Sequence, residues 1–295
     1  MRINPLFGPA YSFSADNDCN RPWNESVYKW VKEGSSKFVV QTYTISTGMT
    51  VKGNGLGSRS FQTLTKPHAM MVVGGSVSSY EAGEVWHLFE NRMQIPLVKV
   101  PEDRFYQTDI YRYNVIIMVS GRYRLLNKKE KNRIKQWVAD GNTLITTARG
   151  SEWAVKQKIA DEVLISSKID TLATKKRSNY ERASGTNQKH NIGGAIFGID
   201  LDITHPIAYG YQDRNVPVYK NNRVWLSPSK SRFSTVGKYL DQPHIDGYIS
   251  KENLKIMKGA ASIVVSKRGK GRIVLFADNP NFRGSWYGTN RLFLN

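Results

Sequence analysis

The sequence predicts an α/β fold in which helices cover both faces of a mostly parallel sheet. From Pro67 onward, short apolar runs alternate with segments whose apolar residues recur at helical spacing, which is typical of β-α-β units. Within that region, residues 143–152 have the pattern of a buried strand, a sharp turn and the start of a helix. We therefore expect one α/β domain in residues 67–295 and a small α+β appendage or linker in residues 1–66.

The appendage is predicted from composition. Prolines and polar residues predict loop for the first 22 residues, and a short helix is expected over 24–34, where Gly34 ends it. Residues 37–46 are rich in β-branched and aromatic residues and predict a strand, whereas the glycine-rich segment 47–60 predicts a loop. We find no residues in this region that indicate a chemistry.

The first half of the α/β domain alternates regularly. Ser78 and Asn127 each precede a helix and have a glutamate three residues later, Glu81 and Glu130, which predicts two capping boxes. The first of these helices is expected to bury one apolar face, made of Ala82, Val85, Trp86, Phe89 and Met93. The predicted elements are strands at 69–73, 95–100, 113–119 and 143–147, and helices at 78–93, 128–140 and 151–160.

The second half returns to strands after a polar segment, 161–190, that predicts helix and loop. A hairpin is expected where two apolar runs flank the basic, glycine-rich residues 266–271. The chain stops where an amphipathic helix has just begun, so we expect a truncated C-terminus. The predicted strands are 195–199, 216–220, 224–226, 262–265 and 272–276, an order that matches a flavodoxin-like, doubly wound domain.

Composition excludes some classes of function. The chain has 295 residues, of which 40% are hydrophobic, and no run of about 18 apolar residues that could span a bilayer. Cys19 is its single cysteine, so an internal disulfide or a cysteine zinc site cannot form. The net charge of +19 suits a polyanionic partner, but the basic residues are dispersed. The densest run, 175–177, lacks interleaved aromatic residues, so we expect a solvated surface and do not expect nucleic-acid binding.

The turn at residues 146–150 resembles the nucleophile turn of class I glutamine amidotransferases, with Gly150 as its closing glycine. The position of that family's cysteine holds Ala148, whose methyl group cannot attack a carbonyl. Ser151 lies on the helix side of the turn and is expected to point elsewhere. The late His205-Pro206 pair lacks the carboxylate that the family has two positions further on. We therefore predict no catalytic residue.

A metal site is not expected either. His87 and Glu90 fit a loose His-x-x-Glu pattern, but His87 falls on the polar face of the first predicted helix of the domain and reads as a solvated side chain. The chain has no His-Glu-x-x-His motif and no paired cysteines.

Candidate binding residues come from the ends of the predicted strands, because doubly wound sheets bind ligands beyond the carboxyl ends of their strands. The loop 74–79 opens a helix and could bind an anion through its N–H groups, although a tight connection between strand and helix is the more ordinary role. The candidates are Ser76, Ser78, Ser120 and Arg149, together with Asp278, Asn279, Asn281 and Arg283 after the last strand.

Three stretches, 71–87 (MVVGGSVSSYEAGEVWH), 202–210 (DITHPIAYG) and 271–290, resemble the C-terminal amidotransferase-like domain of large exported bacterial zinc carboxypeptidases. The resemblance covers residues 67–295. It implies that the zinc site lies in a peptidase domain encoded upstream, so this chain carries no zinc or other cofactor. It also implies export, although residues 1–5 lack the apolar segment of a signal.

The resemblance therefore predicts a non-catalytic accessory module whose partner is a zinc carboxypeptidase domain. An alternative is a stand-alone module that binds a carbohydrate, a peptide or a polyanion at the strand ends. In either case we predict no membrane span.

Overall fold

The computed structural model describes residues 2–3, 25–37, 42–43, 49, 53, 65–166 and 190–295. The chain divides into two compact units, one of Met1–Lys66 with Ile203–Gln212 and Asn295, the other of Pro67–Asp202 with Asp213–Leu294. In the first unit, α1 (Glu25–Lys37) covers the predicted helix, and β1 (Arg2–Ile3) pairs antiparallel with β2 (Thr42–Tyr43). The expected loops of the first 22 residues and of 47–60 fall almost wholly outside the described residues, and Cys19 and residues 167–189 do so entirely.

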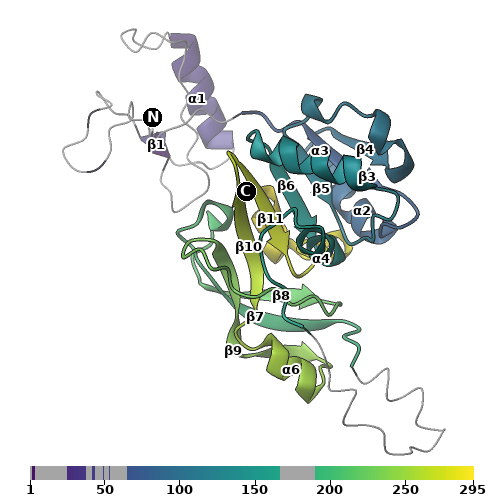
Figure 1. Cartoon of the computed structure of the whole chain (residues 1–295). Coiled ribbons are helices and arrows are strands. Elements are labelled where there is room, and N and C mark those ends of the chain that lie inside the picture. The colour runs from purple at the N-terminus through teal and green to yellow at the C-terminus, as the bar shows by residue number, and fades with distance from the viewer. Residues whose placement is uncertain are drawn as a thin grey trace, which may run out of the picture. The chain divides into compact units, whose positions relative to one another are not determined.

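The second unit contains the flavodoxin-like sheet that the sequence predicts. Five parallel strands lie side by side (Figure 1). Numbered by their order in the chain, they are arranged 2-1-3-4-5 across the sheet, which is the doubly wound order. In spatial order they are β4 (Leu97–Pro101), β3 (Ala69–Val73), β5 (Val115–Met118), β6 (Thr143–Thr147) and β11 (Gly271–Phe276).

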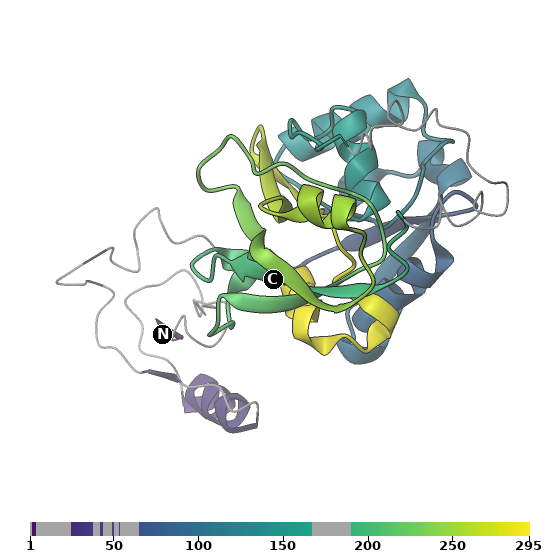
Figure 2. The same ribbon diagram turned by 90° about the horizontal axis from the view of Figure 1, so that it is seen from below.

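Antiparallel strands extend the same sheet beyond β11. The predicted hairpin joins β11 to β10 through a two-residue turn at Gly269 and Lys270. Residues 224–226 do not form the predicted strand, because Leu226 makes only isolated bridges. The long strand β9 escaped prediction because its second half is polar and exposed. The extension consists of β10 (Ala261–Arg268), β9 (Thr235–Gly247), β7 (Ala195–Leu201) and β8 (Asn215–Lys220) (Figure 2).

Helices cover both faces of the sheet. On one face, α3 (Lys128–Ala139) and α4 (Arg149–Lys156) pack into the main core. On the other, Phe276 of β11 contacts Phe293 of α7 (Tyr287–Leu294), which also meets Phe89 beyond α2 (Ser79–Trp86). A short helix, α6 (Lys251–Met257), was not predicted. No helix in the described part of the chain is long and apolar enough to cross a membrane.

The predicted buried face of α2 is partly wrong. Ala82, Val85 and Phe89 are buried, but Trp86 is 37% exposed and Met93 is 39% exposed, whereas Leu88 is buried. A π-helical segment, His87–Arg92, follows α2, and its wider turn shifts Met93 from the position that regular α-helical spacing predicts. Trp86 precedes that segment, and its Nε1 donates to the Glu90 carboxylate at the surface.

One predicted capping box is complete and the other is half formed. Asn127 and Glu130 cap each other's backbone N–H groups at the start of α3, as predicted. At α2, the Ser78 hydroxyl accepts from the Glu81 N–H at 3.4 Å, but the Glu81 side chain does not return to Ser78. Its carboxylate is bound elsewhere, at the candidate site.

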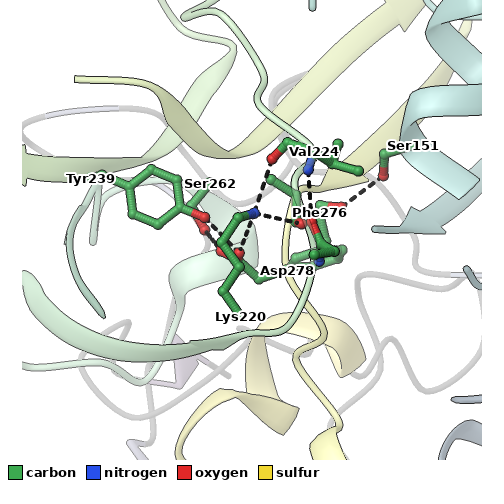
Figure 3. A network of polar contacts seen from close by, with 9 residues as sticks. Ser151, Lys220, Val224, Tyr239, Ser262, Phe276 and Asp278 are labelled. Carbon is green, nitrogen blue, oxygen red and sulfur yellow. Dashed lines mark hydrogen bonds and ion pairs between the residues drawn. The ribbon is translucent and has the colours of Figure 1, made fainter. Parts of the chain in front are cut away.

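A buried ion pair ties the antiparallel strands to the loop after β11. Lys220 Nζ lies 3.0 Å from Asp278 Oδ1 and also donates to the carbonyls of Val224 and Ala277 (Figure 3). Asp278 accepts further bonds from Tyr239 Oη at 2.5 Å and Ser262 Oγ at 2.6 Å. Burial lowers the pKa of Lys220, and the Asp278 carboxylate offsets part of that shift. All three ammonium protons have acceptors, so the charge is compensated although no water reaches it.

We predict that Lys220→Met lowers the free energy of unfolding by about 3–5 kcal/mol, because it leaves the Asp278 carboxylate buried without a counter-ion. Urea denaturation measures the loss. The matched control is Arg214→Met, which removes the ion pair to the half-exposed Asp200 and should change stability far less, because water screens an exposed pair. Equal losses of unfolding free energy in the two variants would show that the buried pair contributes no more to stability than the exposed pair.

Candidate functional site

The turn between β6 and α4 has the backbone of a nucleophile elbow and an alanine at its centre. Ala148 adopts φ 46° and ψ −117°, a strained conformation for a residue with a Cβ. Its N–H donates to the Phe276 carbonyl at 2.8 Å, which anchors the turn to β11. At Gly150 a Cβ would lie 2.4 Å from the Met118 carbonyl oxygen, so glycine allows α4 to begin against β5. The elbow is present, and Ala148 is only 1% exposed.

Ser151 has a structural position beside the elbow. Its side chain is fully buried, and its Oγ donates to the Phe276 carbonyl at 2.8 Å and lies 2.8 Å from Thr146 Oγ1. The hydroxyl therefore holds α4 against the ends of β6 and β11. This agrees with the prediction that Ser151 points away from a substrate.

The histidines considered in the sequence have separate structural positions. His205 accepts from the Ile207 N–H at 3.2 Å and caps the short helix η7 (Pro206–Ala208). His87 is exposed, and the Glu90 carboxylate binds Trp86 Nε1 and Lys99 Nζ. No group of three or more His, Cys, Asp or Glu side chains within the described ranges is placed to hold a metal ion.

The loop 74–79 is closed by a carboxylate of the chain itself, which corrects the expectation for Ser76 and Ser78. Ser76 Oγ donates to Glu102 Oε2 at 2.6 Å, and Glu102 is buried. The Val77 N–H donates to the Gly74 carbonyl and the Ser78 N–H to the Ser120 carbonyl. With the Ser76 hydroxyl and the Val77 and Ser78 N–H groups engaged internally, the loop works as a tight connection between strand and helix.

Ser120 is joined to α2 and β6 by Glu81. The Glu81 carboxylate is 8% exposed, and its Oε2 accepts from the Ser120 N–H and from Thr147 Oγ1, both at 3.1 Å. Burial raises the pKa of Glu81, and the nearby Glu84 adds to the rise, whereas the two hydrogen bonds oppose it. A buried acid with a raised pKa thus lies directly beside the elbow.

Glu84 connects α2 to the loop after β11 in the same way. Its Oε2 accepts from Asn279 Nδ2 and its Oε1 from the Arg283 N–H, each at 2.6 Å. Burial raises the pKa of Glu84, against the hydrogen bonds from those two residues. We call the six residues that meet at the carboxyl ends of the parallel strands the strand-end cluster: Glu81, Glu84, Ser120, Thr147, Asn279 and Arg283.

The other predicted binding residues do not join this cluster. Asp278 is buried in the Lys220 network, and Asn281 is also buried, so neither faces a ligand as expected. The cavity beside Asp278 has a volume of about 10 Å³, which is roughly the space of one water. Arg149 is exposed at the elbow, with no side-chain partner among the described residues.

An aromatic ledge lies beside the strand-end cluster, made of Tyr219, Phe282, Trp286 and the Arg283 side chain. Tyr219 and Phe282 stack with ring centroids 3.4 Å apart, and Trp286 lies 6.5 Å from Tyr219. The exposed Arg283 guanidinium lies 5.3 Å from the Phe282 ring centroid. These rings are only half-buried, so apolar faces and a cation are available to a ligand at this edge.

Sequence reasoning missed the residues that organise the site. Glu81 was interpreted only as a capping residue, and Glu84 only as a neighbour of His87. Their spacing of three places both on one helical face, which was the available signal. Tyr219 carried no such signal, because it comes from β8 and reaches the ledge only through the antiparallel extension.

The chain matches no model of a protein family, and no curated protein sequence matches it. Solved structures similar to it include a proposed GMP synthase subunit from Thermoplasma acidophilum, with 11% identity over 78% of this chain and 92% of that chain and a TM-score of 0.44. A proposed ThuA-like protein from Bacteroides uniformis has 13% identity over 80% of this chain and 92% of that chain, with a TM-score of 0.48. A β-galactosidase from Bacillus circulans sp. alkalophilus has 14% identity over 76% of this chain and 30% of that chain, with a TM-score of 0.39. The structural neighbours thus include amidotransferase-like folds.

Glu81 should make stability depend on pH. Its pKa is raised in the folded state above the ordinary 4.5, so the folded chain binds more protons and the free energy of unfolding falls as pH rises from about 4.5 through the folded pKa. Glu81→Gln keeps an acceptor for Ser120 and Thr147 and should flatten this fall. Urea denaturation of the native chain and the variant at several pH values measures the pH dependence of the free energy of unfolding.

Glu90→Gln is the control of opposite sign, because the hydrogen bond from Trp86 lowers the pKa of Glu90. Glu90 contributes stability that is gained as pH rises toward about 4.5, so Glu90→Gln should remove that gain at acid pH and leave the fall above pH 4.5 in place. If Glu81→Gln left the pH profile unchanged, the raised pKa of Glu81 would be contradicted.

A second prediction concerns the elbow. Ala148→Val should lower the free energy of unfolding by roughly 2 kcal/mol or more, because a β-branched residue at positive φ adds strain at a buried position. Ala148→Gly, which suits positive φ, is the control and should change stability far less. Thermal and urea denaturation of both variants test the strained geometry.

Proposed function

We propose that this chain is a non-catalytic binding module built on an amidotransferase-like fold. The observation that carries the proposal is the elbow, which keeps its strained backbone and its helix start while its central side chain is the buried methyl of Ala148. The neighbouring hydroxyl of Ser151 is committed to the Phe276 carbonyl. A thiolate or alkoxide for acyl transfer is therefore missing where the fold would present one.

The aromatic ledge is the surface that best suits a ligand. Half-exposed rings favour a ligand with a flat apolar face, and the Arg283 guanidinium favours a carboxylate. A carbohydrate or peptide that carries a carboxylate has both features. The strand-end cluster supports the ledge, since Glu84 and Asn279 hold the loop that presents Arg283.

A zinc carboxypeptidase domain as partner remains part of the proposal. It rests on the three sequence stretches 71–87, 202–210 and 271–290 alone. Co-expression with the peptidase domain encoded upstream, followed by affinity purification, tests it. Recovery of a one-to-one complex supports the accessory role, and recovery of this chain alone contradicts it.

The absence of glutaminase activity is the first test of the proposal. The native chain should release no ammonia from glutamine, and Ala148→Cys should not restore the activity, because the slot is buried and His205 is not followed by the family's carboxylate. A coupled assay for ammonia measures both proteins. Turnover by the native chain would overturn the non-catalytic assignment.

Ligand binding at the ledge is the second test. Calorimetry with trigalacturonate, cellotriose and carboxylate-bearing tripeptides should detect binding of at least one carboxylate-bearing probe. Arg283→Asn should weaken it about tenfold or more, because Asn tolerates the positive φ of Arg283 but lacks its charge. Arg149→Asn is the matched control at the elbow and should have no effect. If Arg149→Asn weakened binding and Arg283→Asn did not, the ligand would bind at the elbow and the ledge assignment would be contradicted.

A further inference from the structure

The structure gathers basic side chains on the face of the sheet that α3 and α4 cover, from the first turn of α3 to the hairpin tip at the amino ends of β6 and β11. The tip of the β10–β11 hairpin lies at one end of α3 in both views, where β6 and β11 begin (Figures 1 and 2). We call the five side chains that α3, the turn after α4 and this hairpin place there the basic patch: Lys131, Lys135, Lys158, Arg268 and Lys270.

Backbone contacts hold the three segments together. Arg268 Nη1 donates to the carbonyls of Lys158 at 3.2 Å and Ile159 at 2.8 Å, which fixes the turn after α4 beside the hairpin. The Lys270 N–H donates to the Ala139 carbonyl at 2.9 Å, which fixes the hairpin tip to the last turn of α3. The hairpin cannot shift outward easily, because Gly269 lies so close to Ala139 that a Cβ there would be 2.4 Å from its carbonyl oxygen. The patch is thus built on anchored elements.

The patch is not neutralised by the chain itself. Burial lowers the pKa of Lys135, and the positive charges of Arg268, Lys158 and Lys131 lower it further, which shows how close these cations lie. Two acids are nearby. Asp161 is mostly exposed and lies 3.9 Å from Arg268, and Asp140 accepts bonds from Tyr111 and Gln136. Like charges held at short range favour an anionic partner.

The surroundings of the patch indicate which polyanion fits. Neither α3 nor the hairpin carries a large apolar side chain that is exposed, so the surface has no wedge for a membrane. No aromatic side chain belongs to the patch itself, and the exposed Tyr111 beside it is bonded through its hydroxyl to Asp140. Lysine and arginine side chains that act as point charges suit the phosphates of a duplex, which are evenly spaced along its backbone.

We propose that the basic patch binds the phosphate backbone of double-stranded nucleic acid without regard to sequence. This interaction goes beyond the proposed ligand site, with which the patch shares no residue. The sequence did not indicate it, because the five residues are scattered between positions 131 and 270 and only the fold brings them together. The run at 175–177 lies outside the described residues and is not needed.

The test is fluorescence anisotropy of the full chain with a labelled 20-base-pair DNA duplex of arbitrary sequence. We expect binding at about 50 mM salt. The logarithm of the association constant should fall linearly with the logarithm of salt concentration, with a slope of about −3 to −4.5 if most of the five cations meet phosphates. The triple variant Lys131→Gln, Lys135→Gln and Lys270→Gln should bind at least tenfold more weakly and reduce the slope by about 2.7.

The matched control is the triple variant Lys251→Gln, Lys255→Gln and Lys258→Gln on and after α6, which removes the same charge from another surface. It should bind within about threefold of the native chain. Circular dichroism melts confirm that both variants fold. If the two variants lost the same affinity for the duplex, only net charge would matter and the proposal for the basic patch would be overturned. So would absence of duplex binding at 50 mM salt, or capture by phosphatidylserine vesicles but not by the duplex.

Discussion

The buried pair of Lys220 and Asp278 is the interaction on which the arrangement of the ligand surface depends. Lys220 ends the edge strand β8, and Asp278 is the second residue after the end of β11, so one ion pair links strands that are separated by β10, β9 and β7 in the sheet. Tyr239 and Ser262, from those intervening strands, complete the shell of the carboxylate. Because Asn279 and Arg283 come next in the chain, the same pair sets where the loop meets Glu84.

The two ends of the parallel strands are built for different purposes. At the carboxyl ends, buried acids and a strained turn are closely bonded, and only the ledge remains open. Along α3 and at the hairpin tip, basic side chains from three segments are exposed or half-buried, with Asp161 and Asp140 nearby. The two proposals assign a small ligand to the ledge at the carboxyl ends and a polyanion to the basic patch.

Local sequence patterns were sufficient for the parallel part of the fold. The alternation of apolar runs and helices predicted all five strands, and the Asn127–Glu130 cap was read correctly because a capping box involves residues only three apart. The same logic failed at α2, where Trp86 is exposed and the π-helical segment displaces Met93. It also failed at Asp278 and Ser76, since their partners Lys220 and Glu102 are distant in sequence and give these polar candidates structural roles.

The central claim is that the elbow is a retained piece of architecture while the ledge binds the ligand. Amide chemical-shift mapping of the isotope-labelled chain titrated with trigalacturonate and with carboxylate-bearing tripeptides tests it most directly. The account predicts that shifts concentrate at Tyr219, Phe282 and Arg283 and that Ala148 and Arg149 stay unchanged. Shifts centred on Ala148, or an absence of shifts at the ledge with every probe, would contradict it.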